Sequence, residues 1–217
     1  MRFAKGCFLW IVVAEKHDYA MDKRAISLNN SLNFHTNMKE KIKLLFFQHT
    51  LRRWHFEAIL AESVISRERV YHFLKELLRE KLIRRVKRKG KMPYYLANRD
   101  SAKFRSEKRL YGLTMLERSG LFENLNSCKG IKTAILFGSF ARGDWSKSSD
   151  IDLFIFGDDS EFEKGVYEQR LHREIQVFAY QNTRMLKKKL DQTVIPNIAK
   201  GFFITESAEP FEVRIHG

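Results

Sequence analysis

The clearest helical pattern in the chain follows Ser66, a residue type that often caps the N-terminus of a helix. Five apolar residues then recur at spacings of 0, 3, 4, 7 and 8 and make one stripe: Val70, Phe73, Leu74, Leu77 and Leu78. Shorter apolar patterns before this stripe predict two more helices, at 38–48 and at 53–61. The chain therefore predicts three short helices in succession.

Two strand-like runs follow the third helix, within residues 82–97. A basic turn containing Gly90 separates them, and Pro93 is of the kind found on an edge strand. This pattern predicts a β-hairpin.

Three short helices followed by a basic hairpin resemble a winged helix-turn-helix domain, over residues 38–97. The resemblance implies that the third helix enters the major groove of double-stranded DNA. It places the nucleic-acid contacts on the third helix and on the wing, at Arg67, Arg69, His72, Lys75, Lys87, Arg88, Lys89 and Lys91. A solvated basic face is the alternative interpretation of each of these side chains.

The distribution of charge agrees with a nucleic-acid partner for this region alone. The 217 residues have a net charge of +14. Residues 39–97 hold 16 lysines or arginines against 6 aspartates or glutamates, whereas residues 128–217 hold 13 of each kind. A concentrated positive charge favours binding to a polyanion, and phosphate contacts carry no sequence information.

The chain has two cysteines, Cys7 and Cys128, and their spacing excludes a zinc site built from cysteines. Free thiols fit a reducing compartment, so we expect a cytoplasmic location. The apolar run at 7–14 is too short to span a bilayer, and no membrane partner is expected. Export through a signal peptide is the weaker alternative. We expect residues 1–37 to be a loosely attached extension, with Met38 as an alternative start.

Two apolar runs of strand length, 131–137 and 151–156, flank the most informative segment. Gly138 ends the first run and permits a tight turn, after which Ser139 and nearby backbone N–H groups can donate to phosphate oxygens. Asp150 and Asp152 begin the second run, and their spacing places both side chains on one face of a strand. Such a pair of carboxylates favours a divalent cation such as Mg²⁺.

A Gly-Ser pair, ten residues and then Asp-x-Asp resembles the nucleotidyltransferase superfamily related to DNA polymerase beta, over residues 128–217. The resemblance implies an α/β (α+β) fold with a small mixed sheet and helices on one side. It also implies transfer of a nucleoside monophosphate from a nucleoside triphosphate such as ATP. By position, Gly138, Ser139, Gly143 and Ser149 belong to the nucleotide site, while Asp150 and Asp152 bind Mg²⁺. Arg142 is either a phosphate contact or the partner of Asp144.

The superfamily usually supplies a third carboxylate from a later strand, for which residues 173–180 are the candidate here. Aligned on the flanking apolar residues, Gln176 occupies the expected position. Glutamine is a poorer metal ligand and cannot act as a base. Glu174, two residues earlier, is the alternative third catalytic carboxylate if the strand is shifted, or else an ordinary strand end.

The sequence thus predicts an N-terminal winged-helix domain at 38–97, a helical connector at 98–127 and a minimal nucleotidyltransferase domain at 128–217. The leading hypothesis is a Mg²⁺-dependent nucleotidyltransferase that also binds DNA, with a partner protein, a homodimer or the basic domain completing a small acceptor pocket. The second hypothesis is a DNA-binding transcriptional regulator whose transferase fold senses nucleotide. The third is an antitoxin paired with a HEPN-type partner.

Overall fold

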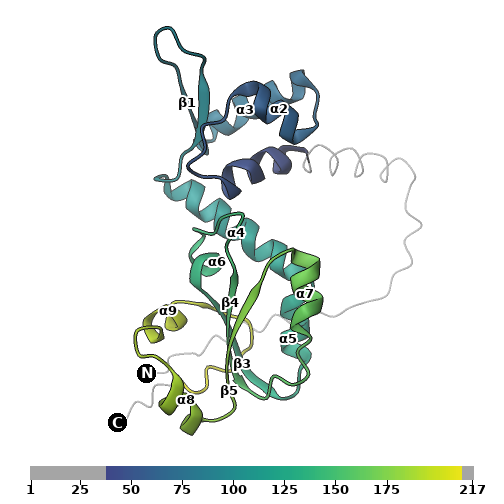
Figure 1. The fold of residues 1–217 in the computed structure, drawn as a ribbon, viewed down its shortest axis with the longest axis vertical. Helices are drawn as coiled ribbons and strands as arrows, with labels where there is room; N and C mark the ends of the chain where they lie inside the picture. Colours follow the sequence, from purple (N-terminus) through teal and green to yellow (C-terminus); the bar gives the residue numbers. More distant parts are fainter. Residues whose placement is uncertain (1–37, 212–217) are drawn as a thin grey trace, which may run out of the picture. The chain divides into compact units, whose positions relative to one another are not determined.

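The computed structural model describes residues 38–211, so the predicted extension at 1–37 lies outside the described residues. Residues 38–48 are helical and are followed by α2 (Phe56–Ser63) and α3 (Arg67–Arg79), which confirms three successive helices (Figure 1). The predicted start of the second helix at residue 53 is wrong. Trp54 instead forms an isolated β-bridge with Tyr95, in which each N–H donates to the other's carbonyl, at 2.9 and 2.8 Å.

The predicted hairpin consists of β1 (Ile83–Val86) and β2 (Tyr94–Ala97), which pair antiparallel. Gly90 lies in the connecting turn with a φ of +71°, a conformation that favours glycine. On α3 the apolar stripe is buried as predicted, with Val70, Leu74 and Leu77 at most 1% exposed. Ser66 occupies the N-cap position of α3, although its side chain makes no capping hydrogen bond.

Two helices occupy the predicted helical connector, namely α4 (Ala102–Arg118) and α5 (Leu121–Ser127). Phe47, from the first helical segment, packs edge-on against Phe104 and Tyr111 of α4 and against Trp145, with ring centroids 5.3 to 6.3 Å apart. All described elements belong to one compact unit that begins at Met38.

The larger sheet has four strands: β3 (Ile131–Phe137), β4 (Ile151–Gly157), β5 (Ile175–Tyr180) and β6 (Phe202–Phe203). Their spatial order is β5-β4-β3-β6, and only β4 and β5 are parallel. A parallel pair needs a crossover, which contains α7 (Lys164–Leu171). The mixed sheet and its helices confirm the predicted α+β fold.

Side chains of β4 alternate between two buried clusters, as expected for a strand covered on both faces. Leu153 and Ile155 pack in the cluster that includes Leu116 of α4 and Leu125 of α5. Phe154 and Phe156 pack in the other cluster, with Leu186 of α8 (Thr183–Lys189) and Ile198 of α9 (Ile195–Ala199). Helices therefore cover both faces of the sheet, rather than the one face that the resemblance implied. By its even position, Asp152 lies on the face of Phe154.

Candidate functional site

The ends of three strands bring the predicted carboxylates together with the Gly-Ser turn. In the pairing register, Asp152 of β4 lies opposite Phe137, the last residue of β3, and opposite Gln176 of β5. Asp150 immediately precedes β4, and its Oδ2 accepts a hydrogen bond from Nε2 of Gln176 at 3.1 Å. We call Gly138, Ser139, Asp150, Asp152 and Gln176 the carboxylate site.

Gly138 is required by both the backbone conformation and the lack of space. It begins the short helix α6 (Gly138–Arg142) with a φ of +67°, which side chains other than hydrogen rarely permit. A Cβ atom at this position would overlap the carboxylate of Asp152. The sequence predicted a tight turn at this glycine, and the turn also brings the backbone directly against the Asp152 carboxylate.

Ionisation of Asp152 is disfavoured by its surroundings. Asp152 is half-buried, and burial, followed by the charge of Asp150, raises its pKa above the ordinary value. The charge of Arg142 and a backbone hydrogen bond from Ser139 act in the opposite direction on the same pKa. A divalent cation between the two carboxylates would relieve the repulsion.

Only part of a metal site can be assigned to these residues. Within residues 38–211, no group of three or more His, Cys, Asp or Glu side chains is placed to hold a metal ion. Two carboxylates still fit Mg²⁺, because this ion commonly binds one or two protein carboxylates, substrate phosphates and several waters. Asp150 and Asp152 are therefore the side chains that would hold it.

Gln176, rather than Glu174, is the cross-strand neighbour of Asp152. Glu174 lies just before β5 with an exposed side chain, and its carbonyl accepts a hydrogen bond from the Ile151 N–H at 2.9 Å. The strand register thus agrees with the alignment on apolar residues and places a neutral amide beside the two aspartates.

The segment between α6 and β4 is held from several sides. Gly143 ends α6 with a φ of +80°, and a Cβ there would lie 2.8 Å from the Cβ of Arg109 on α4.

Arg142 donates from Nε to Asp144 at 3.2 Å, which is the pairing that the sequence left open as an alternative to phosphate contact. The hydroxyl of Ser149 accepts a hydrogen bond from the Ser146 N–H at 2.8 Å. In this structure Ser149 therefore stabilises the loop that leads into Asp150.

Arg173 is a contributor to this loop that the sequence did not identify. One terminal nitrogen of its guanidinium donates to the carbonyls of Ser146, Lys147 and Ser149, at 2.9, 3.0 and 2.7 Å. The guanidinium also lies over the rings of Phe140 and Trp145, whose planes are stacked with an angle of 3°. Arginine suits this position because its planar fork can both donate and stack. No sequence pattern predicts these contacts, because the partners of Arg173 are backbone carbonyls 24 to 27 residues earlier.

The buried Lys108 is another unpredicted charged residue near this loop. It lies on α4 with 2% of its surface exposed, and its ammonium is 4.9 Å from the ring centroid of Trp145. The Trp145 indole N–H donates to the Lys108 carbonyl at 3.2 Å. Burial lowers the pKa of Lys108 to about 8, while the charge of Asp144 acts to raise it.

Several of the predicted nucleic-acid contacts are occupied by partners within the protein. Arg67 pairs with Glu57 at 2.9 Å, His72 pairs with Glu76 at 3.0 Å, and Arg69 donates to the sulfur of Met38. The four predicted wing contacts are Lys87, Arg88, Lys89 and Lys91. All four are exposed, and none of them forms an ion pair within residues 38–211. These four wing residues thus differ from Arg67 and His72, which each have a carboxylate neighbour.

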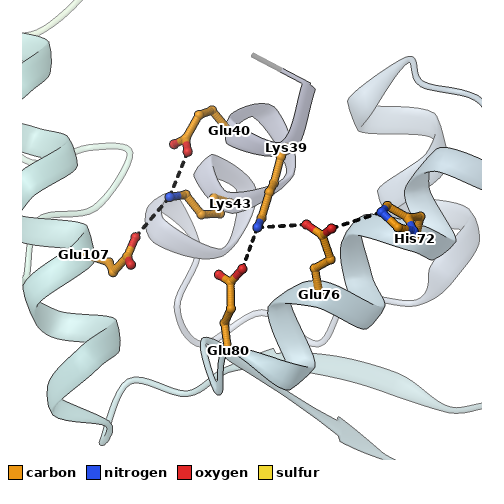
Figure 2. Close-up of polar contacts among 7 residues, drawn as sticks. All are labelled: Lys39, Glu40, Lys43, His72, Glu76, Glu80 and Glu107. Carbon is orange, nitrogen blue, oxygen red and sulfur yellow. Dashed lines mark hydrogen bonds and ion pairs between the residues drawn. The ribbon is translucent and has the colours of Figure 1, made fainter. Parts of the chain in front are cut away.

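Figure 2 shows how charged pairs connect α3 to the first helical segment. Lys39 lies between Glu76 and Glu80, at 2.9 and 2.6 Å, and Glu76 also contacts His72 (Figure 2). Lys43, on the same segment, lies between Glu40 and Glu107 of α4. The hydrogen bond from Lys39 lowers the pKa of Glu76 below its ordinary value, although burial acts to raise it.

The described residues contain neither a disulfide nor a helix that could cross a membrane. Cys128 is a buried free thiol, and burial raises its pKa. No helix between residues 38 and 211 is long and apolar enough to cross a bilayer.

Comparison with known proteins identifies the region that holds the carboxylate site. Residues 119–202 match the family described as "Nucleotidyltransferase domain". The chain is also similar to a protein of Methanocaldococcus jannaschii named "Putative protein adenylyltransferase", with 47% identity over 49 residues. That alignment covers 20% of this chain and 49% of the relative, so the chain spans about half the length of the curated protein that it matches. The match to this family thus covers β3, β4 and β5, the turn and both aspartates.

Proposed function

We propose that the chain is a Mg²⁺-dependent nucleotidyltransferase that transfers a nucleoside monophosphate from a nucleoside triphosphate to an acceptor. The observation that carries the proposal is the convergence of Asp150 and Asp152 with the Gly138–Ser139 turn, within a domain that matches the nucleotidyltransferase family. The backbone at Gly138 and Ser139 would bind triphosphate oxygens, and the two aspartates would hold Mg²⁺.

In this reaction an acceptor oxygen forms a bond to the α-phosphorus of the triphosphate. The bond from that phosphorus to the oxygen that bridges to the β-phosphate breaks, pyrophosphate leaves with the electron pair, and the acceptor proton passes to solvent. Bound Mg²⁺ would neutralise the developing charge on the phosphate oxygens. Gln176 cannot take the acceptor's proton because its amide is neutral. We assign Arg142 and Gly143 to the phosphate side of the site, Ser149 to the support of its loop, and Glu174 to the outer edge, as an exposed strand end.

The acceptor that we favour is a protein side chain, with ATP as donor. The support is the name of the similar protein of Methanocaldococcus jannaschii, "Putative protein adenylyltransferase". A HEPN-type protein partner would be one such acceptor, and a homodimer would be another means of completing the pocket. Neither is required for the chemistry proposed here.

We further propose that residues 38–97 form a winged-helix module that binds nucleic acid. Three helical segments, the β1–β2 hairpin and the Trp54–Tyr95 bridge support this assignment. The exposed cations of the hairpin support a phosphate contact, and double-stranded DNA is the ligand that this architecture favours.

The test of the enzymatic proposal is an incorporation assay with each of four labelled nucleoside triphosphates and Mg²⁺, with and without cell extract as a source of acceptors. We expect labelled product from ATP that disappears with chelator and in the Asp150→Ala/Asp152→Ala variant. The control is Glu163→Gln, which removes an exposed carboxylate that makes no side-chain cap to α7. Equal labelling by the double variant would refute the proposal.

A second candidate function is a nucleotide-sensing DNA-binding regulator. It is favoured by one observation, namely that a neutral Gln176 faces Asp152 and donates to Asp150. In this case ATP with Mg²⁺ would change DNA affinity while no acceptor becomes labelled. The same assay, combined with DNA binding measured with and without ATP, separates the two functions.

A further inference from the structure

The surface between α3 and the hairpin is hollowed. A cavity of about 240 Å³ is lined by Tyr71, Leu74, Lys75, Leu78, Arg85 and Tyr95. We call it the α3–hairpin cavity. Its volume is below the roughly 300 to 1,000 Å³ of sites that enclose a whole small-molecule ligand. It is therefore suited to one part of a larger ligand, with the remainder lying outside.

The lining of this cavity combines an apolar interior with a cationic and aromatic rim. Leu74 is 1% exposed and Tyr95 is 8% exposed, whereas Tyr71 is 62% exposed. Tyr71, Lys75 and Leu78 follow one another at helical spacings of four and three, so they lie on one face of α3. Arg85 and Tyr95 are cross-strand partners in the hairpin. Two rigid elements therefore supply the two sides.

Carboxylate partners are present for some of the basic residues of α3 and absent for others. Arg67 and His72 have carboxylate partners, but Lys75 and Arg85 form no ion pair within residues 38–211. Arg85 also leads directly into the wing with its four exposed cations. The ligand that complements this surface is a polyanion with an aromatic component.

We infer that the α3–hairpin cavity binds an unpaired base of a single-stranded nucleic acid, with the flanking phosphates on Lys75 and Arg85. This inference rests on the proposed nucleic-acid role of residues 38–97. A base in a duplex has both faces covered by its neighbours, whereas an unpaired base can stack on a tyrosine ring. The ring of Tyr71 is the exposed aromatic surface of the cavity, and the apolar floor accepts the base edge that is withdrawn from water.

The test measures binding of the full-length chain to three fluorescent oligonucleotides by anisotropy at fixed salt. They are a blunt duplex, the same duplex with a single-stranded 3′ overhang, and that overhang with abasic sites in place of bases. We expect the overhang to bind more tightly than the blunt duplex, and the abasic overhang to lose the difference.

Substitution of the rim separates stacking from charge. Tyr71→Leu should weaken overhang binding about tenfold, because one stacked base contributes about 1 to 3 kcal/mol. Tyr71→Phe retains the ring and should bind as the parent does. Lys75→Gln and Arg85→Gln should each reduce the slope of log affinity against log salt by about 0.7. Lys103→Gln removes an exposed cation from α4 and serves as the charge control.

Two outcomes would overturn the inference in different ways. If Tyr71→Leu and the abasic sites change nothing while Lys87→Gln weakens every oligonucleotide, the surface contacts phosphates alone, and the nucleic-acid role stands without the base site. If none of the three oligonucleotides binds at low salt, the nucleic-acid role of residues 38–97 fails together with the inference. The substituted residues at the rim are exposed, so unchanged thermal unfolding should confirm that each variant folds.

Discussion

The two aspartates of the carboxylate site differ from Arg67 and His72 of α3 in the charge of their neighbours. Asp150 and Asp152 carry like charges, and their neighbour Gln176 is neutral. On α3, Arg67 and His72 each face a carboxylate. A concentration of like charge in a fixed backbone frame calls for a ligand of opposite charge, whereas a compensated pair serves the fold. The absence of a directly paired opposite charge, rather than charge as such, distinguishes the surfaces that we propose to bind ligands.

The largest effect is expected where the backbone itself forms the site. Gly138→Ala should lower affinity for ATP with Mg²⁺ about 100-fold, a loss of about 3 kcal/mol, because the new methyl group overlaps the Asp152 carboxylate at a positive φ. Isothermal titration calorimetry measures this affinity. The matched control is Gly165→Ala in α7, where a Cβ meets nothing within 4 Å. Nucleotide binding that survives Gly138→Ala would show that ligand does not approach this turn.

Replacement of Gln176 tests the effect of a neutral side chain beside the two aspartates. Gln176→Asp adds a third carboxylate beside Asp152, and we expect it to raise the rate of nucleotide transfer at least about tenfold, since a positioned base contributes roughly 10²-fold or more. Glu174→Gln should change this rate less than about twofold. Initial rates of label incorporation measure both. A greater loss from Glu174→Gln than gain from Gln176→Asp would identify Glu174 as the working carboxylate.

These two positions also show how much the sequence could predict. The apolar runs of β3 and β4 indicated where the Gly138 turn and Asp152 lie, and the apolar residues that flank Gln176 placed it in β5, because a strand's register follows its buried face. By contrast, the ion pair of Arg67 joins it to Glu57, ten residues away on another helix. The donation from Arg173 to three carbonyls likewise depends on tertiary packing. Features set by the backbone could therefore be predicted from the sequence. Side-chain contacts between different helices, strands and loops could not.

A buried cation without an ion-pair partner should cost stability. Lys108→Met should raise the free energy of unfolding at pH 7 by about 1 kcal/mol, roughly 3 °C in Tm. The reason is that burial destabilises the ammonium by more than its contact with Trp145 stabilises it. Lys103→Met, on the exposed side of the same helix, is the control. A lower Tm for Lys108→Met would show that the cation stabilises the loop through Trp145.

The stability gain from Lys108→Met should depend on pH. The folded pKa of Lys108 is about 8 and the ordinary value is 10.5, so between these values the unfolded chain binds more protons than the folded chain. The parent's stability from this group therefore rises with pH across that window, and the advantage of Lys108→Met should shrink from pH 7 to pH 10. Urea unfolding of parent and variant at both pH values measures the difference.

The smallest effect is expected where charges are compensated at the surface. Lys39→Gln should lower the free energy of unfolding by about 0.5 to 1 kcal/mol at low salt, because it removes the ion pairs to Glu76 and Glu80 (Figure 2). The pKa of Glu76 is depressed, so this contribution is present above pH 4.5 and is lost as the pH falls further. Lys41→Gln, an exposed neighbour, should have no measurable effect. An equal loss from both variants would indicate a general charge effect instead of these pairs.

The most direct test of the carboxylate site is the calorimetric titration of ATP into the full-length chain, with Mg²⁺ and with chelator, for the parent and Asp152→Asn. We expect binding that requires Mg²⁺ in the parent, that is lost in Asp152→Asn, and that persists in Glu163→Gln. ATP binding to Asp152→Asn with the parent's affinity and the same dependence on Mg²⁺ would contradict this expectation.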